Sequence, residues 1–280
     1  MSAKPVSPAL AASAHAKLAR LEDLLRGYAK VLVAYSGGVD STFLALIAHR
    51  ILGKEALAVT ADSESLAPSE LVEAKALAAQ FSFPHLIVRT EELANPQYAA
   101  NPHNRCYFCK SELMEKLVQV QAERGGAKIA LGAIMDDLGD FRPGESAARE
   151  RGAVFPLREA ELTKAEIRLL SAEMGLPTAD KPAAACLSSR IPFGEEVTAE
   201  KLTQIAQAEA ALHKRGFFEC RVRHHGPVAR IEIPAAHFEA VLAQREELTR
   251  EIKAAGFVFV ALDLQGLRSG SLHEAIKPAN

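Results

Sequence analysis

The chain alternates between short apolar runs and longer segments in which apolar residues recur every three or four positions. The first apolar run starts at Lys30 and leads into the turn at Gly37 and Gly38. Further apolar runs cover 56–63, 84–90 and 128–137. The segments with helical spacing cover 39–52, 69–81, 109–124 and 163–175. Short apolar runs predict buried strands, and strands that alternate with helices predict βαβ units. The pattern therefore predicts a mostly parallel sheet with helices on both faces.

The pattern changes beyond residue 195. A helix over 198–216, opened by Thr198 and ended by Gly216, precedes two alternating strands around the turn His225-Gly226-Pro227. A helix over about 236–255 and a strand over 257–266 follow. The expected fold class is α/β: an open, mostly parallel, Rossmann-like sheet in residues 1–195 and a smaller α+β domain in residues 196–280.

Composition narrows the choice of function. Hydrophobic residues make up 49% and charged residues 24%, which is typical of a soluble globular protein with a substantial core. The net charge of −2 disfavours nucleic acid as the main partner. No apolar run approaches the roughly 20 residues of a membrane span, and the N-terminal stretch lacks the apolar core of a signal peptide. We therefore expect a cytoplasmic protein.

The stretch AYSGGVDSTFL, residues 34–44, has the composition of an anion-binding loop. Gly37 and Gly38 let the backbone approach a ligand closely, and Ser36 and Ser41 add hydroxyl donors. The amides that open the next helix face the same concavity, so donors and helix dipole together stabilise an anion. No lysine follows the second glycine, so this is not a Walker A loop. A Gly-rich turn without a ligand is the alternative.

The cysteines suggest metal or redox chemistry. Cys106 and Cys109 lie at the start of a predicted helix in the string NRCYFCKSEL, where the dipole favours thiolates and the CxxC spacing lets both sulfurs address one metal. A third ligand must come from elsewhere. Cys186 in DKPAAACLSSR and Cys220 are the candidates, and His103 could complete a zinc set.

The first strand after residue 216 carries arginines on one face. Phe218, Cys220 and Val222 alternate with the polar side, so Cys220 is predicted to be a packed core thiol. A hairpin closed at Gly226-Pro227 pairs three positions: Arg221 with Glu232, Arg223 with Arg230, and His225 with Val228. Opposed arginines destabilise a sheet unless an anion lies between them, which favours a phosphate or carboxylate site over a solvated charged face.

The loop string resembles the SGGxDS signature of PP-loop (N-type) ATP pyrophosphatases, which cleave ATP between its α and β phosphates. By that resemblance the loop binds pyrophosphate, and an acidic side chain in it lies near Mg²⁺. The residues this implies are Ser36, Gly37, Gly38, Val39, Asp40 (the one near Mg²⁺) and Ser41. Near the adenosine the resemblance implies Ala34, Thr60, Ala61 and Asp62, at the carboxyl ends of the first two strands.

Several strings together resemble the LarE family of ATP-dependent sulfur transferases, in order from about residue 20 to 275. They are AYSGGVDSTFL, VTADS, RCYFCKSEL, DDLGDFRPG, KPAAACLSSRIPFG, RVRHHGPVARIE and LDLQGLRSGSL. The family contributes to the nickel-pincer nucleotide: ATP adenylylates a carboxylate of a carboxylated nicotinic acid mononucleotide, and sulfur displaces AMP. The resemblance implies that Cys186 is the sulfur-donor cysteine, that Arg190 binds substrate or nucleotide anions, and that Arg221 and Arg223 bind the substrate phosphate.

The presence of Cys106 and Cys109 resembles the three-cysteine members, which hold a [4Fe–4S] cluster with one iron open for an extra sulfide. This implies cluster ligation by Cys106, Cys109 and Cys186. Members with the last cysteine alone give up its own sulfur and become dehydroalanine. Sacrificial transfer from Cys186, and zinc in place of the cluster, are the alternatives. Family members also form homo-oligomers.

Three other functions fit parts of the sequence. PP-loop tRNA thiolases combine the ATP loop with CxxC and a third cysteine, but they usually add recognition modules and a basic surface. A PP-loop amidotransferase needs an ammonia source, and the chain is short for an added glutaminase. A metal or cluster carrier that merely retains the loop predicts no AMP formation with any acceptor.

Overall fold

The computed structural model describes residues 7–139, 142–182 and 185–268, which form two compact units. The first comprises the described parts of Met1–Ser63, Pro68–Thr90 and Cys106–Ala184. The second comprises Glu64–Ala67, Glu91–Arg105 and the chain from Ala185 onward. Each unit is determined by itself, and the division into domains at residue 195 stays a prediction.

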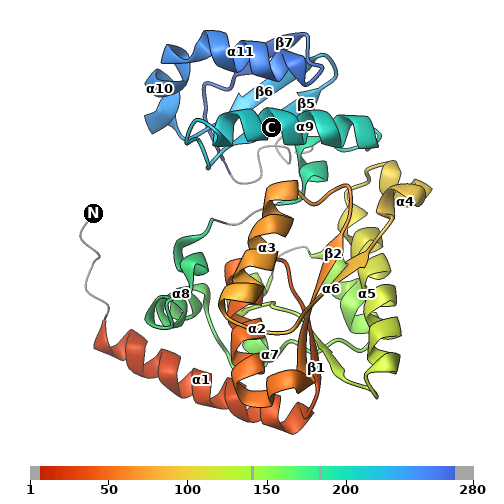
Figure 1. Ribbon diagram of the computed structural model, residues 1–280, viewed down its shortest axis with the longest axis vertical. Coiled ribbons are helices and arrows are strands. Elements are labelled where there is room, and N and C mark those ends of the chain that lie inside the picture. The colour runs from red at the N-terminus through yellow and green to blue at the C-terminus, as the bar shows by residue number, and fades with distance from the viewer. Residues whose placement is uncertain (1–6, 140–141, 183–184, 269–280) are drawn as a thin grey trace. The chain divides into compact units, whose positions relative to one another are not determined.

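The first unit is built on a sheet of four parallel strands in the order β3-β2-β1-β4 (Figure 1). The strands are β1 (Val31–Ala34), β2 (Ala56–Asp62), β3 (His85–Arg89) and β4 (Lys128–Ala130). The order reverses between β1 and β4, and ligands of such sheets bind at the carboxyl ends of the strands beside this point. The predicted α/β class with a parallel sheet is confirmed.

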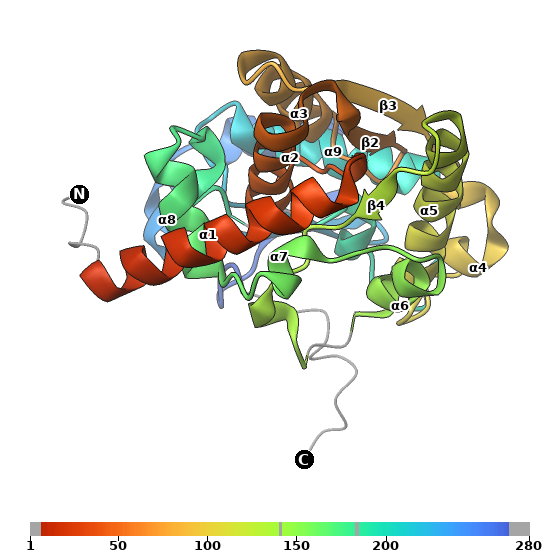
Figure 2. The ribbon, with the colours of Figure 1, turned by 90° about the horizontal axis from the view of Figure 1, so that it is seen from below.

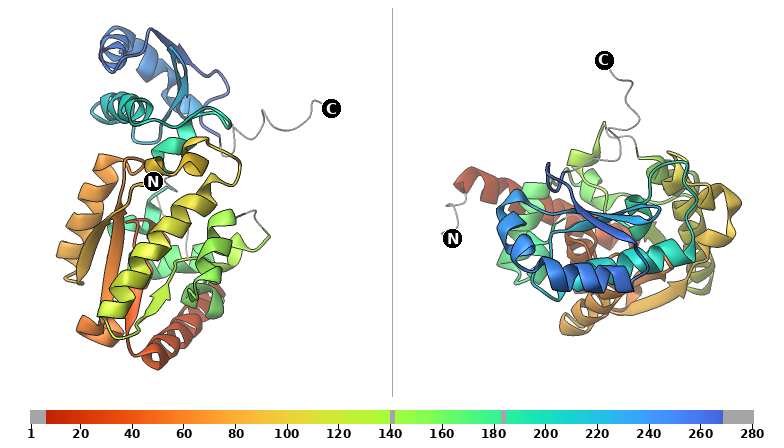
Figure 3. Two further views of the ribbon diagram at one scale, coloured as in Figure 1. Left: turned by 90° about the vertical axis from the view of Figure 1, so that its right-hand side faces the viewer. Right: turned by 90° about the horizontal axis from the view of Figure 1, so that it is seen from above.

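Helices cover both faces of this sheet (Figure 3). Val31 and Val33 of β1 belong to a core with α1 (Pro8–Tyr28), α2 (Val39–Leu52), α3 (Pro68–Gln80) and α8 (Lys164–Glu173). The intervening Leu32 belongs to a separate core with α5 (Arg105–Glu123) and α6 (Pro143–Glu150). Alternate residues of one strand therefore supply the two cores, because successive side chains point to opposite faces. The short helix α7 (Pro156–Glu159) also belongs to this unit, whereas the short helix α4 (Pro96–Ala99) belongs to the second.

The second unit contains the predicted hairpin and one further strand. Strands β5 (Arg221–His225) and β6 (Val228–Glu232) are antiparallel, and β7 (Phe259–Leu262) pairs with β6 in parallel. Helices α9 (Ala199–His213), α10 (Phe238–Ala243) and α11 (Arg245–Ala254) pack on this sheet (Figure 3). Cys220 lies in the shared core, which confirms its prediction as a packed thiol.

Several predicted boundaries were wrong. The helix expected over 236–255 is broken at Gln244, where φ is −108° and ψ is 18°. The strand expected over 128–137 ends at Ala130, and helix α5 starts at Arg105 rather than 109. Phe218 precedes β5 and is 74% exposed, so it does not share the buried face of Cys220. Apolar periodicity identifies a face but does not show where the backbone turns away from it.

No helix in the described ranges is long and apolar enough to cross a membrane.

Helices α1 and α8 lie side by side (Figure 2). Glu166 stabilises the first turn of α8 and also links this helix to α1. Its Oε2 accepts from the amide of Thr163 at 2.9 Å, and its Oε1 accepts from Lys17 Nζ at 2.8 Å. Burial raises the pKa of this carboxyl, but the bonds from Lys17, Ser13 and Thr163 outweigh burial and lower the pKa to about 2. The ionised carboxylate therefore stabilises the α1–α8 contact.

Replacing Glu166 with Gln should lower the free energy of unfolding by roughly 2 kcal/mol at neutral pH. Because the folded pKa of about 2 lies below the ordinary 4.5, the contribution is complete above pH 4.5 and is lost as the pH falls toward 2. The difference between wild type and variant, measured by chemical denaturation, should shrink over this range. Glu161→Gln is the control, since its pair with Arg20 is exposed and should contribute little. Equal effects of both variants would contradict this account.

Candidate functional site

The predicted pyrophosphate loop connects the carboxyl end of β1 to the first turn of α2. Gly37 has a φ of +72°, which favours glycine, and a Cβ added there would lie 3.2 Å from the Cβ of Ala74 in α3. Gly37 is therefore required twice, by its own backbone conformation and by the close approach of α3. On the other side, a Cβ on Gly132, just after β4, would lie 3.2 Å from the amide nitrogen of Ser41. The loop is fixed between its neighbours at the point where the strand order reverses.

Serine hydroxyl groups shape the concavity at the start of α2. Ser41 Oγ donates to Gly38 O and accepts from the amide of Ser36, both at 3.2 Å, and it lies 3.1 Å from Ser36 Oγ. Gly38 is the N-cap and has no side chain that could accept from the first amides of α2. Those donors and the positive end of the helix dipole are available to an anion. These groups are compatible with an anion site, and the binding of pyrophosphate by this loop stays a prediction.

Asp40 meets a lysine that the sequence analysis did not identify. Lys164, the first residue of α8, donates from Nζ to Asp40 Oδ2 at 2.5 Å. Asp40 Oδ1 is buried and has no hydrogen-bond partner among the described residues. Burial raises the pKa of Asp40, and Lys164 opposes that rise without cancelling it. The residues are 124 positions apart, so only the fold brings them together.

A second lysine lies beside the loop. Lys181 Nζ is 2.7 Å from carboxylate oxygens of both Glu70 and Glu73, and 3.4 Å from the carbonyl oxygen of Gly37. Burial lowers the pKa of Lys181, but the two carboxylates outweigh burial and raise it, so the residue stays charged. Two ammonium groups therefore flank a loop whose sequence contains none.

The predicted adenosine residues follow the strand ends, as expected. Ala34 closes β1, and Thr60, Ala61 and Asp62 close β2. Thr60 is 2% exposed, and its hydroxyl donates to Tyr35 O at 2.8 Å and lies 2.8 Å from His85 Nε2. It thus has partners within the fold, and contact of these four residues with adenosine stays a prediction.

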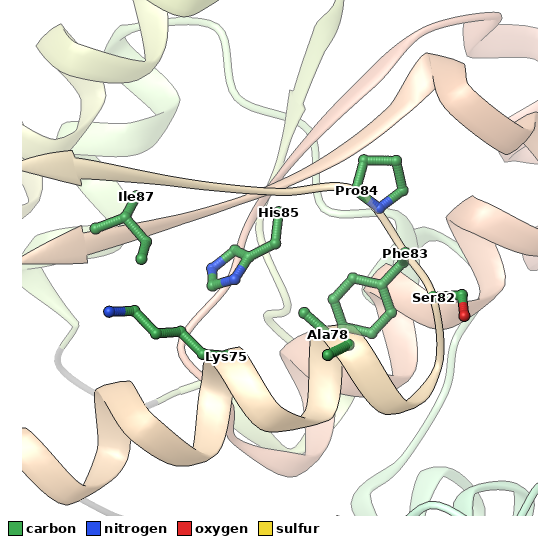
Figure 4. Close-up of a pocket in the computed structure, with 8 residues that line it drawn as sticks. Lys75, Ala78, Ser82, Phe83, Pro84, His85 and Ile87 are labelled. Carbon is green, nitrogen blue, oxygen red and sulfur yellow. The ribbon is translucent and has the colours of Figure 1, made fainter.

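A hollow lies between α3 and the edge strand β3 (Figure 4). Lys75 and Ala78 line it from the helix, and Phe83, His85 and Ile87 line it from the strand side. His85 lies at the amino end of β3, whereas the loop follows the carboxyl end of β1. Parallel sheets bind ligands at the carboxyl ends of their strands, so we do not assign this hollow to the reaction.

In the second unit, Cys186 stands exposed at the start of a short 3₁₀ turn, Leu187–Arg190. Arg190, the last residue of this turn, holds it in place by hydrogen bonds to Glu209 and to the backbone before the turn. Its Nε and Nη2 donate to the two oxygens of Glu209 at 2.8 and 3.0 Å, and its Nη1 donates to Ala185 O at 2.5 Å and Cys186 O at 3.1 Å. Arg190, expected to bind substrate anions, thus has protein partners at all three nitrogens, and its contact with substrate stays a prediction.

The predicted metal ligands are divided between the units. Cys106 is exposed and Cys109 partly exposed in the first two turns of α5, in the first unit, whereas Cys186 belongs to the second. Within the described residues no group of three His, Cys, Asp or Glu side chains is placed to hold a metal ion. The buried Cys220 is unsuited to ligation, because burial raises the pKa of its thiol. Ligation by the three predicted cysteines stays a prediction.

The register of the arginine-bearing hairpin is as predicted: Arg221 lies opposite Glu232, and Arg223 opposite Arg230. The anion between the opposed arginines, however, is Glu232 of the chain itself. Its carboxylate is 2.8 Å from Arg223 Nη2 and 3.1 Å from Arg230 Nη2, and Arg230 also pairs with Asp263 at 2.6 Å.

Arg221 differs from the other two arginines. Its Nη1 donates to the carbonyl oxygen of Arg268 at 3.2 Å. Burial and the neighbouring cations Arg223 and Arg190 lower the pKa of Arg221, although Glu232 and Glu209 oppose this. An anion beside Arg221 would therefore offset both the burial of its charge and the repulsion from Arg223 and Arg190.

The chain is similar in sequence to a known protein family and to several known proteins. Residues 21–132 match the family model described as asparagine synthase. The chain is 45% identical over 93% of its length to an uncharacterized protein of Synechocystis sp., of which it covers 98%. It is 34% identical over 94% of its length to pyridinium-3,5-bisthiocarboxylic acid mononucleotide synthase of Lactiplantibacillus plantarum, of which it covers 96%.

The chain belongs to the LarE family. It is thus an ATP-dependent sulfurtransferase with a PP-loop ATP-binding domain. A further match, 26% identical over 86% of the chain, is an uncharacterized protein of Methanocaldococcus jannaschii.

The LarE sequence did carry a signal for the two missed lysines, although a weak one. Lys164 directly follows the N-cap Thr163, and Lys181 opens the string that leads to Cys186. Neither spacing indicates which distant carboxylate the lysine meets, so their positions had to come from the fold.

Gly37→Ala should reduce ATP-dependent AMP formation by this LarE protein about tenfold, because the added methyl group must displace α3 or the loop. Gly152→Ala is the matched control: its φ is +74°, and nothing lies within 4 Å of the added Cβ. Both variants should lose roughly 1 kcal/mol of stability from backbone strain, measured by denaturation. Equal losses of AMP formation in both would show that the contact with Ala74 is irrelevant to the loop.

Proposed function

We propose that this LarE enzyme adenylylates a carboxylate of a carboxylated nicotinic acid mononucleotide and converts it to a thiocarboxylate. The observation that carries the proposal is the similarity to a pyridinium-3,5-bisthiocarboxylic acid mononucleotide synthase, which is 34% identical over 94% of the chain. The anion loop, the exposed Cys186 and the unbalanced charge at Arg221 support it independently, because the reaction needs a phosphate site, a sulfur site and an acceptor site.

In the first step the acceptor carboxylate attacks the α-phosphorus of ATP, and pyrophosphate leaves. Ser36, Gly37, Gly38, Val39 and Ser41 hold the pyrophosphate through their amides and hydroxyl groups. Ala34, Thr60, Ala61 and Asp62 border the adenosine. This step converts a poor electrophile, the carboxylate, into an acyl adenylate with AMP as its leaving group.

Asp40 suits a magnesium ion. Its buried Oδ1 lacks a hydrogen-bond partner among the described residues, and a hard cation prefers carboxylate oxygen. The ion would neutralise charge on the phosphates, and Lys164 holds the other carboxylate oxygen in place.

In the second step a sulfur nucleophile attacks the acyl carbon and AMP leaves, which gives the thiocarboxylate. We propose that Cys106, Cys109 and Cys186 hold a [4Fe–4S] cluster. Their thiols are at least partly exposed, and residues three apart on a helix share one face, which suits Cys106 and Cys109. Thiolate donors fit an iron–sulfur cluster, and zinc is the alternative metal. When bound, the cluster would supply sulfide for more than one turnover.

Cys186→Ala should abolish sulfur transfer while acceptor-dependent release of pyrophosphate from ATP persists, because the loop proposed to bind ATP is intact and AMP stays bonded to the acyl group. Cys220→Ala should retain transfer, since Cys220 is a core thiol. The product and the protein are analysed by mass spectrometry after turnover with ATP and the carboxylated mononucleotide. An intact chain supports the cluster, whereas a loss of about 34 Da at Cys186, one H₂S, would show sacrificial transfer.

Anaerobic reconstitution followed by Mössbauer spectroscopy tests the ligand set. If Cys186→Ala still assembles a complete cluster and transfers sulfur, the assignment of Cys186 is wrong. Thiolated nucleosides that disappear on deletion of the gene would instead support tRNA thiolation. A chain that forms no AMP with any acceptor would be a carrier.

Arg221→Gln should raise the KM for the phosphate-bearing acceptor roughly tenfold and leave the KM for ATP unchanged, because it removes the unbalanced charge. Arg223→Gln should instead lower the stability, since Arg223 pairs with the fully buried Glu232. Steady-state kinetics and thermal unfolding of the two variants separate these effects. An unchanged acceptor KM in Arg221→Gln would place the phosphate elsewhere.

A further inference from the structure

We propose that Arg105 is a positioning residue for the sulfur of Cys186: it braces the loop that carries the cysteine and places an unbalanced positive charge beside the sulfur. The proposal rests on the proposed role of Cys186 in sulfur transfer. Arg105 precedes Cys106 in the sequence, but its guanidinium lies with the loop of Cys186 in the second unit.

Three buried polar residues from the segment Glu91–Arg105 brace the cysteine loop. Tyr98, Asn101 and Arg105 are 1%, 0% and 4% exposed. Tyr98 Oη lies 2.6 Å from Ser188 Oγ, and Asn101 Nδ2 donates to Pro192 O at 2.7 Å. These bonds span about 90 residues of sequence and fix both ends of the turn that follows Cys186.

Arg105 makes the contact with the sulfur itself. Its Nη1 donates to Ser188 O at 2.9 Å and to Asn101 Oδ1, and its Nη2 lies 3.9 Å from Cys186 Sγ. The guanidinium also lies 5.9 Å from the ring centroid of Tyr98. The guanidinium is buried, whereas the cysteine is exposed, so the charge approaches the sulfur from the protein side and leaves the outer side open to a reactant.

The charge of Arg105 is not balanced by the groups around it. Its hydrogen-bond acceptors are a carbonyl and an amide oxygen, and among the described residues no carboxylate lies within ion-pair distance. Arg190, on the same loop, is paired bidentately with Glu209. A buried cation with neutral acceptors alone is costly, and an anion beside it removes that cost. The sulfur of Cys186, when it carries negative charge, is placed to be that anion.

The competing account is that Arg105 only braces the loop. A brace and a charge differ in one measurable respect. A lost brace changes the reactivity of Cys186 toward every reagent alike, whereas a lost charge changes the preference between anionic and cationic reagents. The ratio of the rate constants for an anionic and a cationic reagent therefore reports the charge beside the sulfur and does not depend on how well the loop is held.

The test measures modification of Cys186 in the full-length protein by two methanethiosulfonates, one anionic (sulfonatoethyl) and one cationic (trimethylammonioethyl). The peptide that carries Cys186 is quantified by mass spectrometry. In wild type the ratio of anionic to cationic rate constants should exceed that of N-acetylcysteine amide by roughly three- to tenfold at low ionic strength. This comparison needs no variant, so it holds even if a substitution prevents folding.

Arg105→Gln, which retains neutral donors, should bring the ratio down to that of the small thiol. Arg105→Lys should keep most of it. Arg215→Gln is the matched control, because its guanidinium is paired with Glu251. A wild-type ratio equal to that of the small thiol, or a ratio unaffected by Arg105→Gln, would overturn the proposal.

The enzyme's own reaction gives a second readout. Arg105→Gln should lower kcat for sulfur transfer at least tenfold with the KM for ATP unchanged, and Arg105→Lys should recover part of it. The reagent ratio involves neither ATP nor acceptor, so it tests Arg105 even if Cys186 has no part in transfer. The two proposals can also fail separately. If Arg105→Gln lowers the ratio of anionic to cationic rate constants as expected, but Cys186→Ala still transfers sulfur fully, the proposed function is overturned and the charge of Arg105 beside Cys186 is established.

Discussion

The buried ion pair of Arg190 with Glu209 organises the second unit. Glu209 lies on α9 and also accepts from the amide of Val222 in β5 at 2.9 Å, so one carboxylate joins a helix, a strand and the cysteine loop. Arg190 also donates to the carbonyl oxygens of residues 185 and 186, so the ion pair restrains the backbone of the cysteine loop. Both charges are buried, so loss of either partner would leave the other uncompensated. The exposed position of Cys186 depends on this pair.

The two units handle charge in the same way. In the first, Lys164 and Lys181 form ion pairs with carboxylates beside the loop that is proposed to bind pyrophosphate. In the second, Glu232 lies between two arginines, whereas Arg221 donates to a carbonyl oxygen, and Arg105 to a carbonyl oxygen, an amide oxygen and a sulfur. Charges that are balanced within the chain stabilise the fold, and those that are not are available to a ligand or a reactant. On this distinction the arginines proposed to be functional differ from those that only stabilise the fold.

Comparison of sequence and structure shows which inferences depend on local pattern. The glycine loop, the alternation of strands and helices, and the hairpin register follow from residues that are close in sequence, and each was predicted. The break at Gln244 was not, because no glycine or proline marks it, and the early end of β4 was not, because the apolar run continues past Ala130 and Gly132. The exposure of Phe218 was missed for a related reason: the alternating pattern in the sequence starts before Arg221, where strand β5 begins.

The sequence by itself determined the parallel α/β architecture, the glycine turn after β1 and the family, because apolar periodicity, glycine conformation and family motifs are properties of short stretches of chain. The roles of the loop and of Cys186 rest on the proposed function. Only the tertiary structure decided which cations meet which anions. Arg105 and Ser188 are 83 residues apart, and Lys164 and Asp40 are 124 apart. Hydrogen bonds and ion pairs act over a few ångströms, so partners this distant in sequence are fixed by the packing of the whole unit.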